Sequence, residues 1–383
     1  MVYQLCQFNS IDKELNDAKA MLSTAADAFQ ASKPAFFEVE MDNFNNSDLQ
    51  WQHFYFKDGE IVIASLGVII RESTIPNVKN LCVTMVNTHD KYRKMGLMED
   101  LFNFVITLYE KKEVKIESSK YSLDDVVLES SLKFIESEIP DKAFWTLYSI
   151  VGTYYSKYGF YPVKNLNFYK CDSPQKLLSD AVFTLKENET FITIENHKKY
   201  IENKQYLPKE NLSQPNIRCC GFESSSITRF LARQKRYLAF QNIECENFGI
   251  VINHGDEKTI FILSSSFMPS ELVIRRFFTS VTNKAILEDD LSRIYSYLQD
   301  YLKNSYFSVL NMKLDGKNNC ILFSDNDIIA ADESKKIICS FFEEELNWKY
   351  DTSNSLDLPM IREWGGFEPK DILWPYSGFW CYD

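Results

Sequence analysis

Residues 86–98 have the sequence VNTHDKYRKMGLM, and they join a strand to an amphipathic helix. Residues 81–86 have the composition of a strand, and residues 97–111 place five apolar side chains on one face at helical spacing. The first turn of a helix leaves several backbone N–H groups without acceptors, at the positive end of the helix dipole. The sequence therefore predicts a strand, a turn and a helix, with an anion-binding site at the turn.

The same turn carries the side chains that an anion site needs. Lys91, Arg93 and Lys94 supply positive charge within four residues, and Gly96 lets the backbone approach a phosphate with no side chain in between. The chain has 12 glycines in 383 residues and a net charge of -12, so a glycine and a cationic cluster here indicate a specific use. A pyrophosphate is the predicted anion. A helix start with ordinary solvated basic residues is the alternative.

Further elements surround this unit in the first half of the chain. Upstream, the pattern predicts a helix over 11–30 and strands over 53–56 and 61–70, with a hairpin turn at Asp58-Gly59. Downstream, it predicts an insertion over 112–143 with a helix over 123–138, a strand over 144–150, a helix over 152–157 and a strand over 166–170. We expect the first domain to cover residues 1–180.

The second half has a similar mixture of elements. The pattern predicts helices over 224–240 and 287–303 and strands over 248–253, 259–264 and 307–312, with a turn at His254-Gly255-Asp256. The succession of a helix and a strand resembles that of the first half. We therefore interpret residues 181–383 as a second α/β domain, a candidate for a degenerate copy of the first.

Composition restricts the class of protein. A chain of 383 residues with 45% hydrophobic residues has material for two packed cores. The net charge of -12 argues against a nucleic-acid partner, because phosphate binding needs a cationic surface. No apolar stretch is long enough to span a membrane and no leader is recognised, so we expect no membrane partner and a cytoplasmic location, with the nucleus as a second compartment. The oligomeric state is left open.

The nine cysteines occur without a CxxC pair or a repeated spacing. This pattern predicts reduced thiols rather than a disulfide framework, and no metal site. The motifs GxSxG, HExxH, GxxxxGK and GxGxxG are all absent from the sequence.

A second informative stretch, residues 147–162, has the sequence LYSIVGTYYSKYGFYP. Together with the turn over 93–98, it resembles the two signature motifs of the GNAT superfamily of N-acetyltransferases. These motifs are Arg/Gln-x-x-Gly-x-Gly/Ala after the fourth strand and an aromatic Tyr-x-x-Tyr/Phe-Gly-Phe block downstream. The resemblance covers about residues 1–170 and implies the GNAT fold, an α/β (α+β) arrangement with a mixed, mainly antiparallel sheet. It also implies acetyl-CoA as the cosubstrate.

Within the superfamily, the chain is similar to the fungal lysine N-acetyltransferase family. The similarity is carried by Val86-x-Thr88, by the run from Leu147-Tyr148-Ser149 to Phe160, and by the tryptophan-rich tail with Trp364, Trp374 and Trp380. Members of that family transfer acetyl from acetyl-CoA to the side-chain amine of free lysine. The resemblance therefore implies a small-molecule amine as the partner, with lysine favoured.

The resemblance also implies roles for individual residues. Tyr155 matches the tyrosine that protonates the departing CoA thiolate, and a tyrosine pKa of about 10 keeps such an acid protonated at neutral pH. Backbone N–H groups near Val86 and Thr88 would hold the thioester carbonyl oxygen. The cofactor pyrophosphate would lie on the turn formed by Arg93, Lys94, Met95, Gly96, Leu97 and Met98.

The acceptor amine must lose a proton before it can attack the thioester. For a lysine side chain with a pKa of about 10.4, this step costs roughly 4 to 5 kcal/mol at pH 7. His89 follows the strand directly, with Asp90 beside it, and His89 is the candidate base.

Two positions depart from the superfamily pattern. Met98 stands where the turn motif ends in a small residue, and Asp90 replaces the proline that is usual before the loop. Two alternatives to a lysine acetyltransferase follow from the sequence. One is a protein or peptide amine acetyltransferase, which would need an open groove. The other is a non-catalytic acetyl-CoA-binding or scaffold protein on a degenerate GNAT fold.

Overall fold

The computed structural model describes most of the chain. The described residues are 2–8, 15–28, 33–45, 50–72, 77–114, 120–123, 125–139, 143–149, 152–162, 168–172, 174–179, 182–201, 217–218, 231–232, 235–236, 239, 246–265, 271–304, 320–351, 358–364 and 372–373. Within them, no helix is long and apolar enough to cross a membrane. Most of the helix predicted over 224–240 and the strand predicted over 307–312 lie outside these residues.

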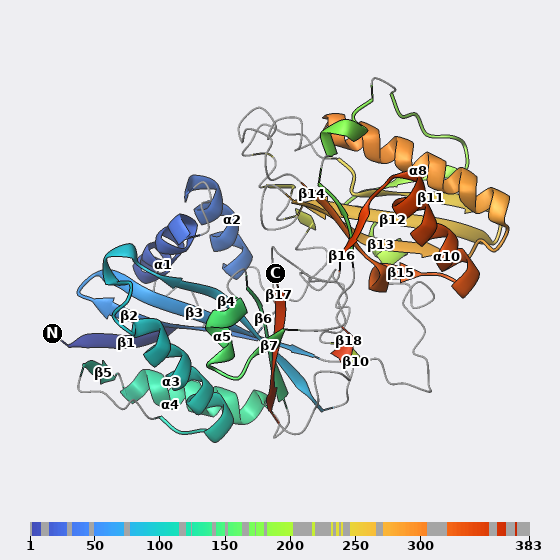
Figure 1. The fold of residues 1–383 in the computed structure, drawn as a ribbon. Coiled ribbons are helices and arrows are strands. Elements are labelled where there is room, and N and C mark those ends of the chain that lie inside the picture. Colours follow the sequence, from blue (N-terminus) through green and yellow to red (C-terminus); the bar gives the residue numbers. More distant parts are fainter. Residues whose placement is uncertain are drawn as a thin grey trace.

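The first sheet has the strand order β5-β1-β2-β3-β4-β6-β17-β7 (Figure 1). Its strands are β1 (Tyr3–Phe8), β2 (Gln50–Asp58), β3 (Ile61–Glu72), β4 (Lys79–Thr88), β5 (Tyr121–Leu123), β6 (Ala143–Ser149), β7 (Tyr161–Pro162) and β17 (Leu358–Trp364). Neighbouring strands are antiparallel except for the pairs β1 with β5 and β4 with β6, which are parallel. The predicted mixed, mainly antiparallel sheet is therefore confirmed.

Helices cover both faces of this sheet, as Figure 1 shows. They are α1 (Leu15–Ala28), α2 (Lys33–Asn45), α3 (Leu97–Lys111), α4 (Asp125–Glu138) and α5 (Gly152–Ser156). Side chains of a strand alternate between faces, so neighbours on β2 meet different helices. Phe54 packs against Phe104 of α3, whereas the Tyr55 hydroxyl donates a 2.7 Å hydrogen bond to Asp17 of α1.

Several local expectations hold in the first half. The hairpin between β2 and β3 turns at Asp58-Gly59, where Gly59 has a φ of 60°. Helix α3 covers 97–111 as predicted and buries its apolar face in the first core. The segment 112–143, expected to be an insertion, adds β5 to the sheet edge and α4 to the core, where Ile135 is fully buried.

The second sheet has the order β16-β8-β14-β13-β12-β11-β9, and β15 pairs with β13. Its strands are β8 (Phe168–Cys171), β9 (Glu189–Ile192), β11 (Gly249–His254), β12 (Glu257–Ser265), β13 (Glu271–Thr279), β14 (Cys320–Ser324), β15 (Ile328–Ile329) and β16 (Lys349–Asp351). Two helices, α8 (Lys284–Asn304) and α10 (Asp332–Ser340), contribute to a second core. The shorter elements are α6 (Lys198–Ile201), β10 (Ile217–Arg218), β18 (Ile372–Leu373), the 3-10 turns η1 (Asp90–Tyr92), η2 (Pro174–Leu177) and η4 (Asp325–Asp327), and the π turn η5 (Phe341–Glu345).

The two sheets repeat one topology. Read from its β9 edge, the second sheet runs β9-β11-β12-β13-β14-β8-β16, which matches β1-β2-β3-β4-β6-β17-β7 strand for strand. In each sheet one central pair is parallel, β4 with β6 and β13 with β14, and a long helix links its strands. The predicted fold class, a mixed α/β protein with a second α/β copy, is confirmed.

Each sheet contains one strand from the other half of the chain. Strand β8, expected near 166–170 as the last strand of the first domain, instead pairs with β14 and β16 in the second sheet. Strand β17, near the C-terminal end, lies between β6 and β7 in the first sheet. Two strands therefore cross the boundary expected near residue 180.

Burial of one histidine, His53, makes the folding stability of the chain depend on pH. His53 on β2 stacks on Phe8 and lies over Gly67 of β3, where a Cβ would come within 2.5 Å of the imidazole Cε1. Burial lowers the pKa of His53 from 6.5 to about 3. In the unfolded chain His53 takes up a proton below pH 6.5, but in the folded chain it does so only near pH 3. Folding stability is therefore lost as the pH falls through this window.

We predict that His53→Gln flattens the acid side of the stability profile. Between pH 6 and pH 4 the wild-type free energy of unfolding should include a loss of about 1.4 kcal/mol per pH unit from His53, and the variant should lack this contribution. Urea unfolding of both proteins at several pH values in this range measures the difference in slope. Parallel curves for the two proteins would contradict the assignment.

Candidate functional site

The site begins at an irregularity in β4. The pairing of β3 with β4 shifts between Ser65 and Gly67, and at this point Met85 has a φ of 52°. The Asn87 side chain holds the irregularity, since its Nδ2 donates to the Met85 carbonyl and to Ser65 Oγ, both at 2.8 Å. Irregularities of this kind redirect a strand and are frequent beside functional sites.

Beyond Cys82, β4 and β6 separate. They pair only from Lys79 with Ala143 to Cys82 with Thr146, although β4 continues to Thr88 and β6 continues to Ser149. A buried hydrogen bond of 2.8 Å from Thr146 Oγ1 to Asn80 Oδ1 closes the paired end. Val86 and Thr88 lie on the part of β4 that has left β6, so their backbone groups on that edge do not pair with it.

A short 3-10 turn, η1, carries the chain from β4 toward α3. His89 caps this turn, because its Nδ1 accepts a hydrogen bond from the Lys91 N–H at 3.3 Å. The Tyr92 hydroxyl donates to Asp58 at 2.8 Å and so ties the turn to the β2-β3 hairpin. The turn is therefore fixed at both ends.

The N-terminus of α3 leaves its backbone donors open. Gly96 is the N-cap with a φ of 80°, and no side chain caps the helix there. The first helical bond runs from the Asp100 N–H to the Gly96 carbonyl, so the N–H groups of Leu97, Met98 and Glu99 have no acceptor in the helix. A Cβ on Gly96 would meet no atom within 4 Å, which means that the positive φ, and not crowding, favours glycine.

The basic residues of the turn are exposed, and one of them is partly neutralised. Arg93 forms a 2.8 Å ion pair with Asp90 and places its Nε 3.4 Å from the Thr88 carbonyl. Lys91 and Lys94 form no ion pair with any residue that the structure describes. The open N–H groups and these two lysines supply the positive potential at the turn.

Met98, the departure from the expected small residue, points away from the turn. Its side chain is 7% exposed and belongs to the first core, next to the buried Leu97. Met95 is instead 47% exposed. The Met98 side chain therefore packs into the core, and the Met98 N–H is one of the three N–H groups that have no acceptor within the helix.

Tyr155 lies on α5, which packs against the first turns of α3. Its ring contacts Phe102 of α3 with 5.6 Å between centroids, and it also contacts Tyr154 and Phe160. Lys157 adds a 2.6 Å ion pair to Glu99 in the first turn of α3. One helix thus has the uncapped N–H groups at its start and Tyr155 against its second turn.

Burial raises the pKa of the Tyr155 phenol well above its ordinary value, and the neighbouring Tyr154 adds to the shift. The hydroxyl makes no hydrogen bond to any residue within the described ranges. Tyr155 is therefore protonated and neutral throughout the physiological pH range.

The corresponding place in the second half is closed. The helix α8 is capped by Asn283, whose Oδ1 accepts from the N–H groups of Ala285 at 3.0 Å and Ile286 at 3.4 Å. The parallel strands also differ, because β15 pairs with β13 beyond the end of β14, at Phe277 and Phe278. The second half therefore lacks, within its described residues, both the open helix end and the separated strands.

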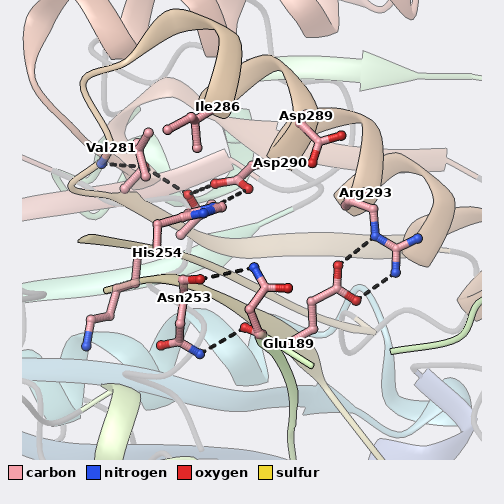
Figure 2. Close-up of polar contacts among 12 residues, drawn as sticks. Glu189, Asn253, His254, Val281, Ile286, Asp289, Asp290 and Arg293 are labelled. Carbon is pink, nitrogen blue, oxygen red and sulfur yellow. Dashed lines mark hydrogen bonds and ion pairs between the residues drawn. The ribbon is translucent and has the colours of Figure 1, made fainter. Parts of the chain in front are cut away.

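Buried polar groups in the second half pair with one another instead. Figure 2 shows His254 beside Asp290 and Arg293 beside Glu189. Asp290 accepts from His254 Nε2 at 2.8 Å and from Thr259 Oγ1 at 2.6 Å, and burial raises its pKa despite both bonds. Arg293 forms two 2.6 Å bonds to the carboxylate of Glu189. Both acidic groups are satisfied within the protein.

The structure brings some of the predicted residues together and leaves one apart. The residues of the turn share the α3 N-terminus, and Tyr155 packs on the same helix. His89 contacts Lys91 and Tyr92, and no described contact joins it to Tyr155. Sequence reasoning missed Asn87 and Asn283. An asparagine before a helix is a recognisable cap, but the contacts of Asn87 depend on the pairing of β3 with β4.

Comparison with solved structures finds acyltransferases and acetyltransferases at low similarity. A probable N-acyltransferase from Enterococcus faecalis V583 is 9% identical over 95% of this chain and 73% of its own, with a TM-score of 0.48. A GCN5-related N-acetyltransferase from Kribbella flavida is 10% identical over 94% and 71%, with a TM-score of 0.46. A tandem GNAT protein from the clavulanic acid biosynthesis pathway is 10% identical over 96% and 100%, with a TM-score of 0.40. No protein-family model and no curated protein matches the sequence.

We predict that inorganic pyrophosphate binds at the start of α3 and that Lys94→Glu weakens this binding about tenfold, or about 1.4 kcal/mol. Lys284→Glu is the matched control, because Lys284 is an exposed lysine at the start of α8, where Asn283 already occupies the helix donors. Calorimetric titration of the three proteins measures the affinities. Equal losses in both variants would contradict a specific site at α3.

Proposed function

We propose that the chain is an acetyl-CoA-dependent N-acetyltransferase whose cosubstrate binds the first half. The observation that carries the proposal is the contrast between two copies of one topology. In the first copy the helix donors are open, the parallel strands separate and a neutral tyrosine packs on the helix. In the second copy Asn283 caps the helix, and β15 pairs with β13 beyond the end of β14.

The residues present fit the chemistry of acetyl-CoA. Its pyrophosphate needs backbone donors and positive charge, which the turn over 93–98 offers together with Lys91. Its pantetheine arm carries amides that can pair with an open strand edge, and β4 offers such an edge beyond Cys82. Bound there, acetyl-CoA would supply an activated acetyl thioester.

In the proposed reaction, the neutral amine of the acceptor attacks the thioester carbonyl carbon and the carbon–sulfur bond breaks. Backbone N–H groups near Val86 and Thr88 would stabilise the oxygen that gains negative charge, a contribution of several kcal/mol in comparable sites, about 2.7 to 4 kcal/mol per donor. Tyr155 would give its proton to the departing thiolate sulfur. The proton that the nitrogen loses must pass to a base or to water.

His89 is the proposed base, and its contact in the loop constrains that role. Nδ1 accepts the Lys91 N–H, so the neutral ring carries its hydrogen on Nε2. To take up a proton, Nδ1 must give up the bond that caps η1. If His89 acts as the base, the η1 turn must therefore rearrange when Nδ1 takes up the proton.

We propose a primary amine as acceptor, with the side-chain amine of free lysine favoured. The net charge of -12 is compatible with a cationic acceptor. The choice of lysine is supported by the resemblance of the motif residues to the fungal lysine N-acetyltransferase family. One residue of the tryptophan-rich tail that contributes to this resemblance, Trp364, packs against the first core. Trp374 and Trp380 lie outside the described residues.

We predict that titration of the chain with acetyl-CoA gives one site per 383-residue chain, because the second copy is closed. Lys94→Glu should weaken this binding about tenfold, and Lys284→Glu should leave it unchanged. Calorimetry measures both the stoichiometry and the affinity. Two sites per chain would contradict the closed second copy, and no binding at millimolar acetyl-CoA would remove the transferase proposal.

We also predict that Tyr155→Phe lowers kcat at least about a hundredfold while the Kd for acetyl-CoA changes less than about threefold, as expected for loss of a general acid. Tyr154→Phe is the matched control on the same helix and should stay within about threefold in kcat. Release of free thiol with lysine as acceptor measures the rate.

The choice of acceptor separates the remaining alternatives. Thiol release with basic peptides but not with lysine would favour a peptide acetyltransferase. Saturable acetyl-CoA binding with no thiol release for lysine, polyamines or peptides would favour a binding or scaffold protein.

A further inference from the structure

Arg362 on β17 reaches out of its own half of the chain to the helix that starts at the candidate site. Its Nε and Nη2 donate to the two carboxylate oxygens of Glu110 on α3, at 2.9 Å and 2.8 Å. The Trp145 indole N–H on β6 donates to the same carboxylate at 3.0 Å. Two parallel hydrogen bonds between a guanidinium and a carboxylate fix the relative orientation of the two groups. The partly buried pair therefore joins β17, α3 and β6 at one point.

The remaining guanidinium nitrogen of Arg362, Nη1, connects it to the backbone near Tyr155. Nη1 donates to the carbonyl of Tyr158 at 2.6 Å, and the N–H of Tyr158 donates to the carbonyl of Tyr155 at 3.0 Å. A continuous line of hydrogen bonds thus runs from the backbone of the candidate acid to Arg362. From there it reaches Glu110 near the end of α3.

Gly159 leaves the space that this contact needs. The glycine has a φ of 80°, and a Cβ at this position would come within 2.5 Å of Arg362 Nη1. Any other residue would therefore be strained in its backbone and would also press on the guanidinium. The absence of a side chain at Gly159 therefore leaves room for the Arg362 guanidinium beside the turn that follows α5.

We infer that Arg362 is a positioning residue for the acetyl-transfer site: it holds the turn after α5 against α3 and so sets the place of Tyr155 relative to the helix that binds the cosubstrate. The inference rests on the proposed function for its catalytic readout. It means that a strand near the C-terminal end of the chain governs the geometry of a site built from residues 85–160. The second half then contributes to activity without holding a cosubstrate.

The chain offers a matched control for this inference. Arg293 also forms a bidentate pair with a partly buried glutamate, Glu189, and its Nη2 also donates to a backbone carbonyl, that of Thr184 at 2.8 Å. This second pair lies in the second half, and no contact joins it to the candidate site within the part of the chain that the structure describes. A loss that reflects only general destabilisation should appear equally in Arg293→Gln and Arg362→Gln.

The first test follows Tyr155 directly and needs no activity. With 3-fluorotyrosine placed at position 155, the fluorine NMR spectrum of the otherwise wild-type chain should show one sharp signal. Arg362→Gln should shift, broaden or split that signal, and Arg293→Gln should leave it unchanged. If Arg362→Gln does not fold, as judged by its melting curve, then Arg362→Lys and Glu110→Gln replace it, because each retains part of the contact. An unchanged signal in a folded variant would overturn the inference.

The second test is a double-mutant cycle with Tyr155→Phe. Arg362→Gln should lower kcat about tenfold, with the KM for acetyl-CoA within about threefold, and Arg362→Lys should recover part of the loss. In the Tyr155→Phe background, Arg362→Gln should have less than about a twofold further effect, because the residue that it positions is gone. Equal losses in both backgrounds would overturn the inference. A Tyr155→Phe variant with full activity would instead refute the proposed acid, and the fluorine signal would then decide the positioning role alone.

Discussion

The exchange of β8 and β17 between the two sheets is the constraint on which the rest of the structure depends. Each sheet contains one strand from the other half of the chain, β8 in the second sheet and β17 in the first. Neither half therefore forms its complete sheet and core from its own residues alone. Met360 of β17 is fully buried in the first core, and Tyr169 of β8 is buried in the second. Burial of such side chains stabilises by roughly 1.5 to 3 kcal/mol each, which ties the folding of the halves together.

The same topology serves two different purposes in the two halves. A helix that follows a parallel strand always presents unpaired N–H groups, and the surroundings decide what satisfies them. In the second half Asn283 satisfies them, and β15 keeps the neighbouring strand paired. Among the described residues of the first half, no side chain caps α3, and no strand pairs with β4 on its β6 side beyond Cys82. The N–H groups at the start of α3 and this edge of β4 are therefore unpaired there and could bind a ligand. The proposed activity is thus located where the fold leaves its own hydrogen-bonding groups unused.

The polar chemistry of the first half follows from burial. The apolar surroundings of Tyr155 keep its phenol neutral, which suits a proton donor but also makes it a weak acid. In the proposed reaction, the same surroundings would also raise the pKa of the CoA thiol, which would favour transfer of the proton to sulfur. Burial does not orient the ring, and we infer that the hydrogen bonds through Tyr158 and Arg362 do so.

The sequence by itself determined the features that depend on neighbours along the chain. The hairpin at Asp58-Gly59, the span of α3 and the cluster of donors and charges over 91–98 all follow from turn residues, helical periodicity and the ends of elements. Strand β1 and helix α2 were not predicted, because their patterns are short or weakly amphipathic and become stable only against the sheet.

Only the tertiary structure decided which strands are neighbours. Nothing in residues 358–364 indicates that they pair with β6, and nothing in residues 168–171 indicates that they leave the first sheet. Strand pairing is set by contacts between residues far apart in sequence, and a short strand carries too little local information to select its partner. The separation of β4 from β6 and the reach of Arg362 to Glu110 depend on that pairing. The turn proposed to bind the anion therefore depends on residues close together in sequence, whereas the position of Tyr155 against α3 depends on strands from both halves of the chain.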